Sequence, residues 1–148
     1  FFKQKTAYEI VDCDWSSDVC SSDLGLEISQ ASWGIDGCGI PTYRVSLESM
    51  ARAAAKLASP GLLRPELAEA VRILNSAIAS NPRFIGGTNS FCSKVVSETE
   101  GRVFAKLGAE GVYTAWIPQA GIGLAIKSED GGARSAEMAM AAVLRELG

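Results

Sequence analysis

The side chains that could attack a substrate are few in this sequence. The 148 residues contain no histidine, so the Ser-His-Asp and Cys-His pairs that activate a nucleophile are absent. A lysine three residues after a serine is another route, because on a helix this spacing places the amine one turn from the hydroxyl. None of the six lysines has a serine three residues before it. The chain therefore shows no activated nucleophile of its own.

A candidate anion-stabilising element lies at residues 106–108 (KLG), at the end of a predicted strand. It is a weak match to the Lys-Thr-Gly element of penicillin-binding proteins and serine β-lactamases, in which the lysine supplies positive charge and the glycine lets a substrate approach the strand. The competing interpretation is an ordinary solvated lysine at a strand end, which is the commoner origin of so short a motif. The tripeptide alone does not define a site.

Three longer blocks give the tripeptide a context. In chain order they are residues 35–41 (IDGCGIP), 105–113 (AKLGAEGVY) and 121–127 (GIGLAIK), the last followed by DG at 130–131 and RSAE at 134–137. Together they resemble the blocks of the L-asparaginase II family, and the similarity covers nearly all of residues 25–148. Three blocks in the same order are far more specific than any one of them.

The resemblance implies an amidohydrolase that converts a small-molecule substrate, L-asparagine, into L-aspartate and ammonia. It also implies a fold similar to serine β-lactamases and glutaminases, with Lys106 as a catalytic residue and no cofactor required. The family's Ser-x-x-Lys nucleophile lies upstream of the block at 35–41. We therefore expect this chain to be a fragment that is inactive by itself.

The same blocks suggest residues that bind the substrate. Asp36 could orient the ammonium group of an amino acid, or it could cap a turn, which is where aspartate is commonest. Glu110, beside the edge of the predicted sheet, has the same two interpretations: it could bind the substrate, or it could be an ordinary turn residue. Gly108 and Cys38 complete the set of expected substrate-binding residues.

Cys38 and Cys92 have two interpretations. Some members of the family hold zinc near the substrate with two cysteines and a lysine, the first cysteine lying in the block at 35–41. The position of that lysine is occupied here by Pro41, which cannot bind a metal, and two thiolates are too few ligands for a zinc site. The alternative is a pair of thiols that line or pack near the site without metal. In either case we expect the two cysteines to border one pocket with Asp36.

Hydrophobic spacing predicts the elements that position these residues. Helices are predicted over residues 47–58, after Ser46 as N-cap, from Pro65 to the Asn81-Pro82 stop, and over 133–147. Strands are predicted over 102–107, 111–117 and 122–128, separated by short glycine-containing turns, while residues 91–96 are too few to assign. The predicted fold class is α+β, an antiparallel sheet flanked by helices, as in part of a serine β-lactamase or penicillin-binding protein.

The N-terminal segment has a different origin. Residues 3–10 (KQKTAYEI) and 14–24 (DWSSDVCSSDL) match, in one frame, the translation of the two constant parts of a common sequencing-library adapter. We therefore expect residues 1–24 to be an adapter-derived segment outside the fold, and residues 25–148 to be the C-terminal part of an asparaginase II-like domain.

Deleting residues 1–24 is expected to leave the free energy of unfolding within about 0.5 kcal/mol of its original value, or to raise it, because nothing selected this segment to pack against the rest. Denaturant unfolding of the two chains measures the difference. A marked loss of unfolding cooperativity in the shorter chain would contradict the adapter interpretation.

The amino-acid composition restricts the kinds of partner that the chain is expected to bind. Residues 25–148 carry twelve basic and twelve acidic side chains, so neither a nucleic-acid-binding stripe nor an acidic tail is expected. Apolar runs are short and broken by charge, so no membrane span is expected. Two cysteines in this part suit a reduced, cytoplasmic setting, although the adapter segment hides any signal peptide. A homodimer is compatible with this sequence.

Two other functions compete with the asparaginase interpretation. One is a glutaminase-like or other hydrolase of the β-lactamase fold, against which the extent of the block match argues. The other is a non-catalytic module that binds a small ligand, which the absence of a Ser-x-x-Lys from the upstream gene sequence would favour.

Overall fold

The computed structural model describes residues 32–37, 39 and 41–147, and the chain divides into two compact units, Phe1–Ser49 and Met50–Gly148. In the first unit, β1 (Trp33–Ile35) and β2 (Pro41–Tyr43) pair antiparallel as a hairpin. The helix α3 (Leu47–Ala58) begins in the first unit and continues into the second.

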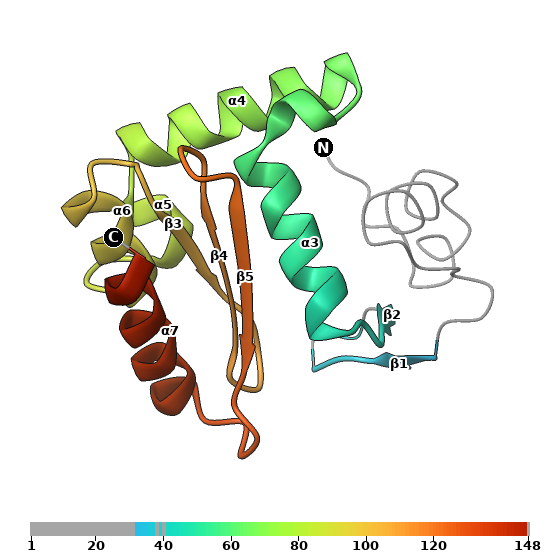
Figure 1. The fold of residues 1–148 in the computed structure, drawn as a ribbon. Coiled ribbons are helices and arrows are strands. Elements are labelled where there is room, and N and C mark those ends of the chain that lie inside the picture. Colours follow the sequence, from blue (N-terminus) through green and yellow to red (C-terminus); the bar gives the residue numbers. More distant parts are fainter. Residues whose placement is uncertain (1–31, 38, 40, 148) are drawn as a thin grey trace, which may run out of the picture. The chain divides into compact units, whose positions relative to one another are not determined.

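The second unit contains most of the regular structure. After α3 it comprises, in chain order, the 3-10 helix η2 (Pro60–Leu62), α4 (Pro65–Ser80), α5 (Arg83–Gly86), α6 (Phe91–Glu98), the strands β3 (Phe104–Leu107), β4 (Val112–Ile117) and β5 (Ile122–Lys127), and α7 (Ala133–Leu147), as Figure 1 shows.

The residues that the sequence suggested as helix N-termini occupy those positions in the structure. The Ser46 hydroxyl accepts a hydrogen bond from the backbone N–H of Ser49 at 3.0 Å, which caps α3, and Pro65 occupies the first turn of α4. α6 occupies the stretch that periodicity could not assign. Its cap is Ser90, whose hydroxyl accepts from the N–H of Ser93 at 3.1 Å. The structure therefore adds a helix of eight residues directly before the sheet.

The three-stranded antiparallel sheet is confirmed, in the order β3-β4-β5. The first strand is shorter than predicted, beginning at Phe104 and not at residue 102. The reason lies in the turn that follows α6, where the N–H of Arg102 donates to the Thr99 carbonyl at 3.0 Å and the N–H of Val103 donates to the Thr99 hydroxyl at 3.1 Å. Those N–H groups are held by the turn and cannot join the sheet.

Each face of the sheet packs on its own set of helices, α7 on one side and α3 on the other, with α6 contributing to both (Figure 1). One face presents Tyr113, Ala105 and Ala115 to α6 and to Ala136 and Met140 of α7. All five of these side chains are at most 2% exposed. Burial of this apolar surface is the main stabilising contribution on this side, and it fixes α7 against the sheet as predicted.

The opposite face packs on α3. Phe104 and Trp116, which are paired across β3 and β4, stack with ring centroids 5.2 Å apart and cluster with Ala54 and Ala58. Gly123 of β5 lies so close to α3 that a Cβ there would come within 2.0 Å of the Ala55 nitrogen. The missing side chain therefore lets the helix and the strand touch through their backbones.

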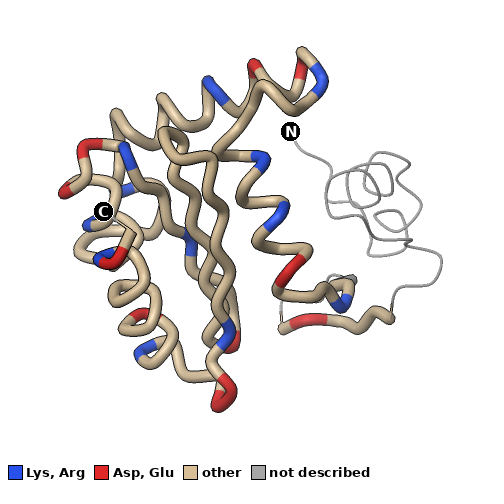
Figure 2. Tube along the Cα trace, in the orientation of Figure 1, with Lys and Arg blue, Asp and Glu red and all other residues tan. Residues whose placement is uncertain are grey.

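Both faces of the sheet are thus covered by helices, and the predicted α+β class is confirmed. Charges of both signs intermix along the described chain, as Figure 2 shows. Among the described residues, no helix combines the length and apolar character needed to cross a bilayer.

Candidate functional site

The predicted catalytic lysine lies at one end of the sheet, where two connections meet. A hydrogen bond from the Gly108 N–H to the Val112 carbonyl, at 2.8 Å, closes the β3–β4 turn. The β5–α7 loop joins this turn, because the Ser128 N–H donates to the Gly111 carbonyl at 2.9 Å. We call this region the sheet-end site, comprising Lys106, residues 108–111, residues 128–132 and Ser135. Cys92, Tyr113 and Glu137 lie near the same end of the sheet, on the face opposite Lys106.

Lys106 is exposed in the second-last position of β3, opposite Thr114 of β4. Its amine donates to the carbonyl oxygen of the next residue, Leu107, at 2.8 Å. An ammonium group has three donors, so two remain for an anionic or carbonyl oxygen of a ligand. The geometry suits a side chain that stabilises negative charge at the open end of the sheet.

Gly108 and Glu110 shape the turn next to Lys106. An added Cβ at Gly108 would meet the Val112 side chain at 3.3 Å, and Glu110 adopts a left-handed conformation with φ of 54°. The Glu110 carboxylate reaches across to the β5–α7 loop, where a Cβ on Gly131 would lie 2.9 Å from its Oε2. Both residues therefore have structural roles in the turn, and their contact with substrate stays a prediction.

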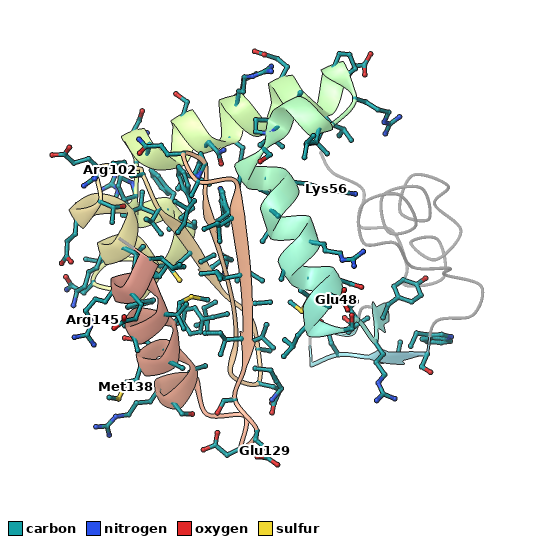
Figure 3. All side chains as sticks on the ribbon, viewed as in Figure 1. Glu48, Lys56, Arg102, Glu129, Met138 and Arg145 are labelled. Carbon is teal, nitrogen blue, oxygen red and sulfur yellow. The ribbon has the colours of Figure 1, made fainter. Side chains whose placement is uncertain are left out.

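A hydroxyl and carboxylate network organises the facing loop. The Asp130 carboxylate accepts from the Ser128 hydroxyl, from the Gly132 N–H at 2.8 Å and from the Ser135 hydroxyl at 3.2 Å. The Ser128 hydrogen bond, followed by those of Gly132 and Ser135, holds the pKa of Asp130 below its ordinary value. Figure 3 shows Glu129 at the tip of this loop. Asp130 and Ser135 belong to the sequence blocks described above, but the network itself was not predicted.

Tyr113 and Glu137 connect the sheet to α7 on the face opposite Lys106. The Tyr113 hydroxyl donates to Glu137 Oε2 at 3.4 Å, although the two residues are 24 positions apart in sequence. Burial, followed by the nearby Cys92 and Glu137 side chains, raises the pKa of Tyr113 to about 12. Tyr113 is therefore a neutral hydrogen-bond donor at neutral pH and not a base.

The titration of Tyr113 can be tested directly. The chain contains three tyrosines, and we expect Tyr113 to ionise near pH 12 and not near 10. Its pKa is raised by folding, so its stabilising contribution is complete below about pH 10 and is lost as pH rises towards 12. Ultraviolet absorbance of ionised tyrosine measures this, and Tyr113→Phe should remove the late step. Ionisation of every tyrosine near pH 10 would contradict the prediction.

Cys92 is buried beside this pair, in the first turn of α6, and is 1% exposed. Burial raises the pKa of its thiol, against the opposing effects of the Leu107 backbone and the positive charge of Lys106. A thiol with a raised pKa stays protonated at neutral pH, and only the thiolate is an effective nucleophile. Cys92 therefore contributes packing and polarity here and no activated nucleophile.

The remaining predicted site residues belong to the first unit. Asp36 is partly buried in the β1–β2 connection, where its carbonyl accepts from the Gly39 N–H at 3.0 Å. Cys38 lies outside the described residues. The expectation that Cys38, Cys92 and Asp36 border one pocket therefore stays a prediction. Within the described part of the chain, no three His, Cys, Asp or Glu side chains are grouped as a metal site.

The sheet end thus carries an exposed ammonium group on one face of the sheet, a neutral phenol on the opposite face, and an ordered carboxylate network in the β5–α7 loop. The ammonium group is able to stabilise an oxyanion. A search with family models adds that the L-asparaginase II model matches residues 16–148. The match begins inside the segment attributed to adapter DNA, so the origin of residues 16–24 stays a prediction. No curated protein matches the chain.

Proposed function

The chain belongs to the L-asparaginase II family, and we propose that it forms part of an amidohydrolase that converts L-asparagine into L-aspartate and ammonia. The family match over residues 16–148 is the observation that supports this proposal most strongly. The exposed Lys106 amine in the sheet-end site is consistent with it, because amide hydrolysis develops negative charge on the carbonyl oxygen.

In the proposed reaction, a serine oxygen attacks the side-chain carbonyl carbon of asparagine, and the protonated amide nitrogen leaves as ammonia. Water then cleaves the resulting ester, which releases aspartate and restores the serine. The serine and its lysine come from a Ser-x-x-Lys sequence upstream of residue 25, because no lysine of this chain follows a serine at that spacing. Lys106 stabilises the charged oxygen in both steps.

In this proposal the substrate is bound by residues of two sequence blocks, the block at 35–41 and the block at 105–113 that contains Lys106. Asp36 pairs with the ammonium group of asparagine, and Glu110 with Gly108 forms the wall next to Lys106. Cys38 lies beside Asp36 in the sequence block at 35–41.

Zinc has no assigned step in this proposal. The residues described around Cys92 do not fit a zinc site by themselves, because no group of three potential ligands is assembled there. The raised pKa of the Cys92 thiol also disfavours the thiolate that zinc requires, unless the metal itself displaces the proton. A structural role for Cys92 is sufficient.

The proposal is tested against its alternatives by measuring turnover of three substrates by the enzyme rebuilt with its upstream gene sequence. We expect ammonia release from L-asparagine to exceed that from L-glutamine, with no opening of a chromogenic β-lactam. Faster turnover of glutamine or of the β-lactam would favour another hydrolase of the same fold. Binding of asparagine without turnover would favour a non-catalytic module.

A further inference from the structure

A cavity lies at the opposite end of β4 from the sheet-end site. Its volume is about 670 Å³. It is bounded by α6, the turn after α6, the β4–β5 turn and the C-terminal half of α7, and it opens to solvent. β4 begins at Val112 beside the sheet-end site and ends at Ile117 in this cavity, so five steps of roughly 3.3 Å each separate the two.

The walls of the cavity are fixed by hydrogen bonds that do not depend on a ligand. The Thr99 hydroxyl donates to the Val95 carbonyl at 2.7 Å and accepts from the Val103 N–H at 3.1 Å. On the other side, the Ala120 N–H donates to the Ile117 carbonyl at 3.1 Å and closes the β4–β5 turn. The cavity is therefore preformed, which lowers the entropic cost of binding.

The interior of the cavity is apolar. Phe91 and Val95 of α6, Val103, Ile117 and Leu144 of α7 line it with partly buried side chains. Its volume falls within the range of small-molecule sites, which are mostly apolar with a few fixed polar groups.

The charged side chains at the rim give the cavity a net positive charge. Arg102 and Arg145 both line it, and Glu98 is the acidic residue among its lining side chains. Figure 3 shows Arg102 and Arg145 on the side of the unit formed by α6 and α7. Arg102 donates its Nε to the Thr99 carbonyl at 3.1 Å, which leaves its terminal nitrogens for a ligand. The rim therefore has an excess of one positive charge.

We propose that this cavity binds an amphipathic monocarboxylate, a medium-length hydrocarbon chain with one carboxylate, at a site separate from that of the proposed hydrolysis. The chain fills the apolar interior, and the carboxylate pairs with the guanidinium groups of Arg102 and Arg145. Guanidinium is the cation best suited to hold a carboxylate through paired hydrogen bonds. A neutral ligand of the same length gains no such pairing, and a cationic one is also repelled by the excess positive charge.

Isothermal titration of the 148-residue chain with octanoate, 1-octanol and octylammonium tests the proposal. We expect octanoate to bind with one site per chain, and to bind at least about tenfold more tightly than 1-octanol. Arg102→Gln and Arg145→Gln should each weaken octanoate about tenfold, whereas Arg134→Gln, at the other end of α7, should not change it. Ala141→Phe fills the cavity and should abolish binding, with circular dichroism showing that the variant remains folded.

Two results would overturn the proposal. One is equal affinity for octanoate and 1-octanol with no effect of either arginine variant. The other is sedimentation evidence that the chain self-associates through this surface and that octanoate leaves the association unchanged, because a second copy would then be the occupant. Neither result bears on asparagine hydrolysis, so the two proposals succeed or fail independently.

Discussion

Replacing Lys106 with alanine, in the enzyme rebuilt with its upstream sequence, is expected to lower kcat for L-asparagine about 100- to 1,000-fold. Lys106 presents an exposed ammonium group at the sheet end. In the proposed reaction this group stabilises negative charge that develops only during reaction. KM should change much less, since the interaction is weak in the ground state. Initial rates of ammonia release over a range of asparagine concentrations separate the two effects.

Two variants control this experiment. Lys94→Ala removes an exposed lysine from α6 and should leave kcat unchanged. Lys106→Arg keeps the charge and should restore part of the activity. Because the Lys106 side chain is exposed, its alanine variant should unfold at nearly the same temperature as the parent. A lowered Tm with unchanged kcat would show that Lys106 is only a structural residue.

Gly123→Ala is expected to destabilise the second unit by about 3 kcal/mol or more, or to prevent its folding. The added Cβ would lie 2.0 Å from the Ala55 nitrogen and 2.2 Å from the Ala51 carbonyl oxygen. Both are backbone atoms, so no side-chain rotation can relieve the overlap, and α3 must move away from the sheet. Denaturant unfolding followed by tryptophan fluorescence measures the change, because Trp116 packs on the same face.

Gly61→Ala is the matched control. Its added Cβ would meet nothing within 4 Å, so we expect a change of less than about 0.5 kcal/mol. Equal stability of the Gly123→Ala variant and the parent would mean that α3 does not pack on β5 as the structure has it.

The sheet and the terminal helix were predictable because their signals are local. Val, Tyr, Trp and Ile enrich β4, and isoleucine occurs twice in β5. Short glycine turns allow neighbouring strands to pair. α6 was missed because eight residues are too few for periodicity to distinguish helix from strand. The available signal was Ser90, a good N-cap directly before the apolar residues of α6.

The site was only partly predictable, because its main contacts join distant residues. Lys106 could be placed at a strand end from its own sequence. The pairing of Tyr113 with Glu137, in contrast, requires α7 to pack across β4, over 24 residues of sequence. The Asp130 network depends on the conformation of the β5–α7 loop, which composition identifies only as a turn. Burial, which governs the pKa values of Cys92 and Tyr113, likewise follows only from the packed fold.

Ammonia release from L-asparagine by two purified proteins tests the central claim most directly. One is the 148-residue chain as it stands, and the other is residues 25–148 joined to the upstream gene sequence. We predict that the joined enzyme releases ammonia and aspartate in equal amounts, whereas the chain alone releases no more than buffer, because it contains neither a histidine nor a Ser-x-x-Lys nucleophile. Ammonia release by the chain alone that Lys106→Ala abolishes would contradict this account, as would an inert joined enzyme.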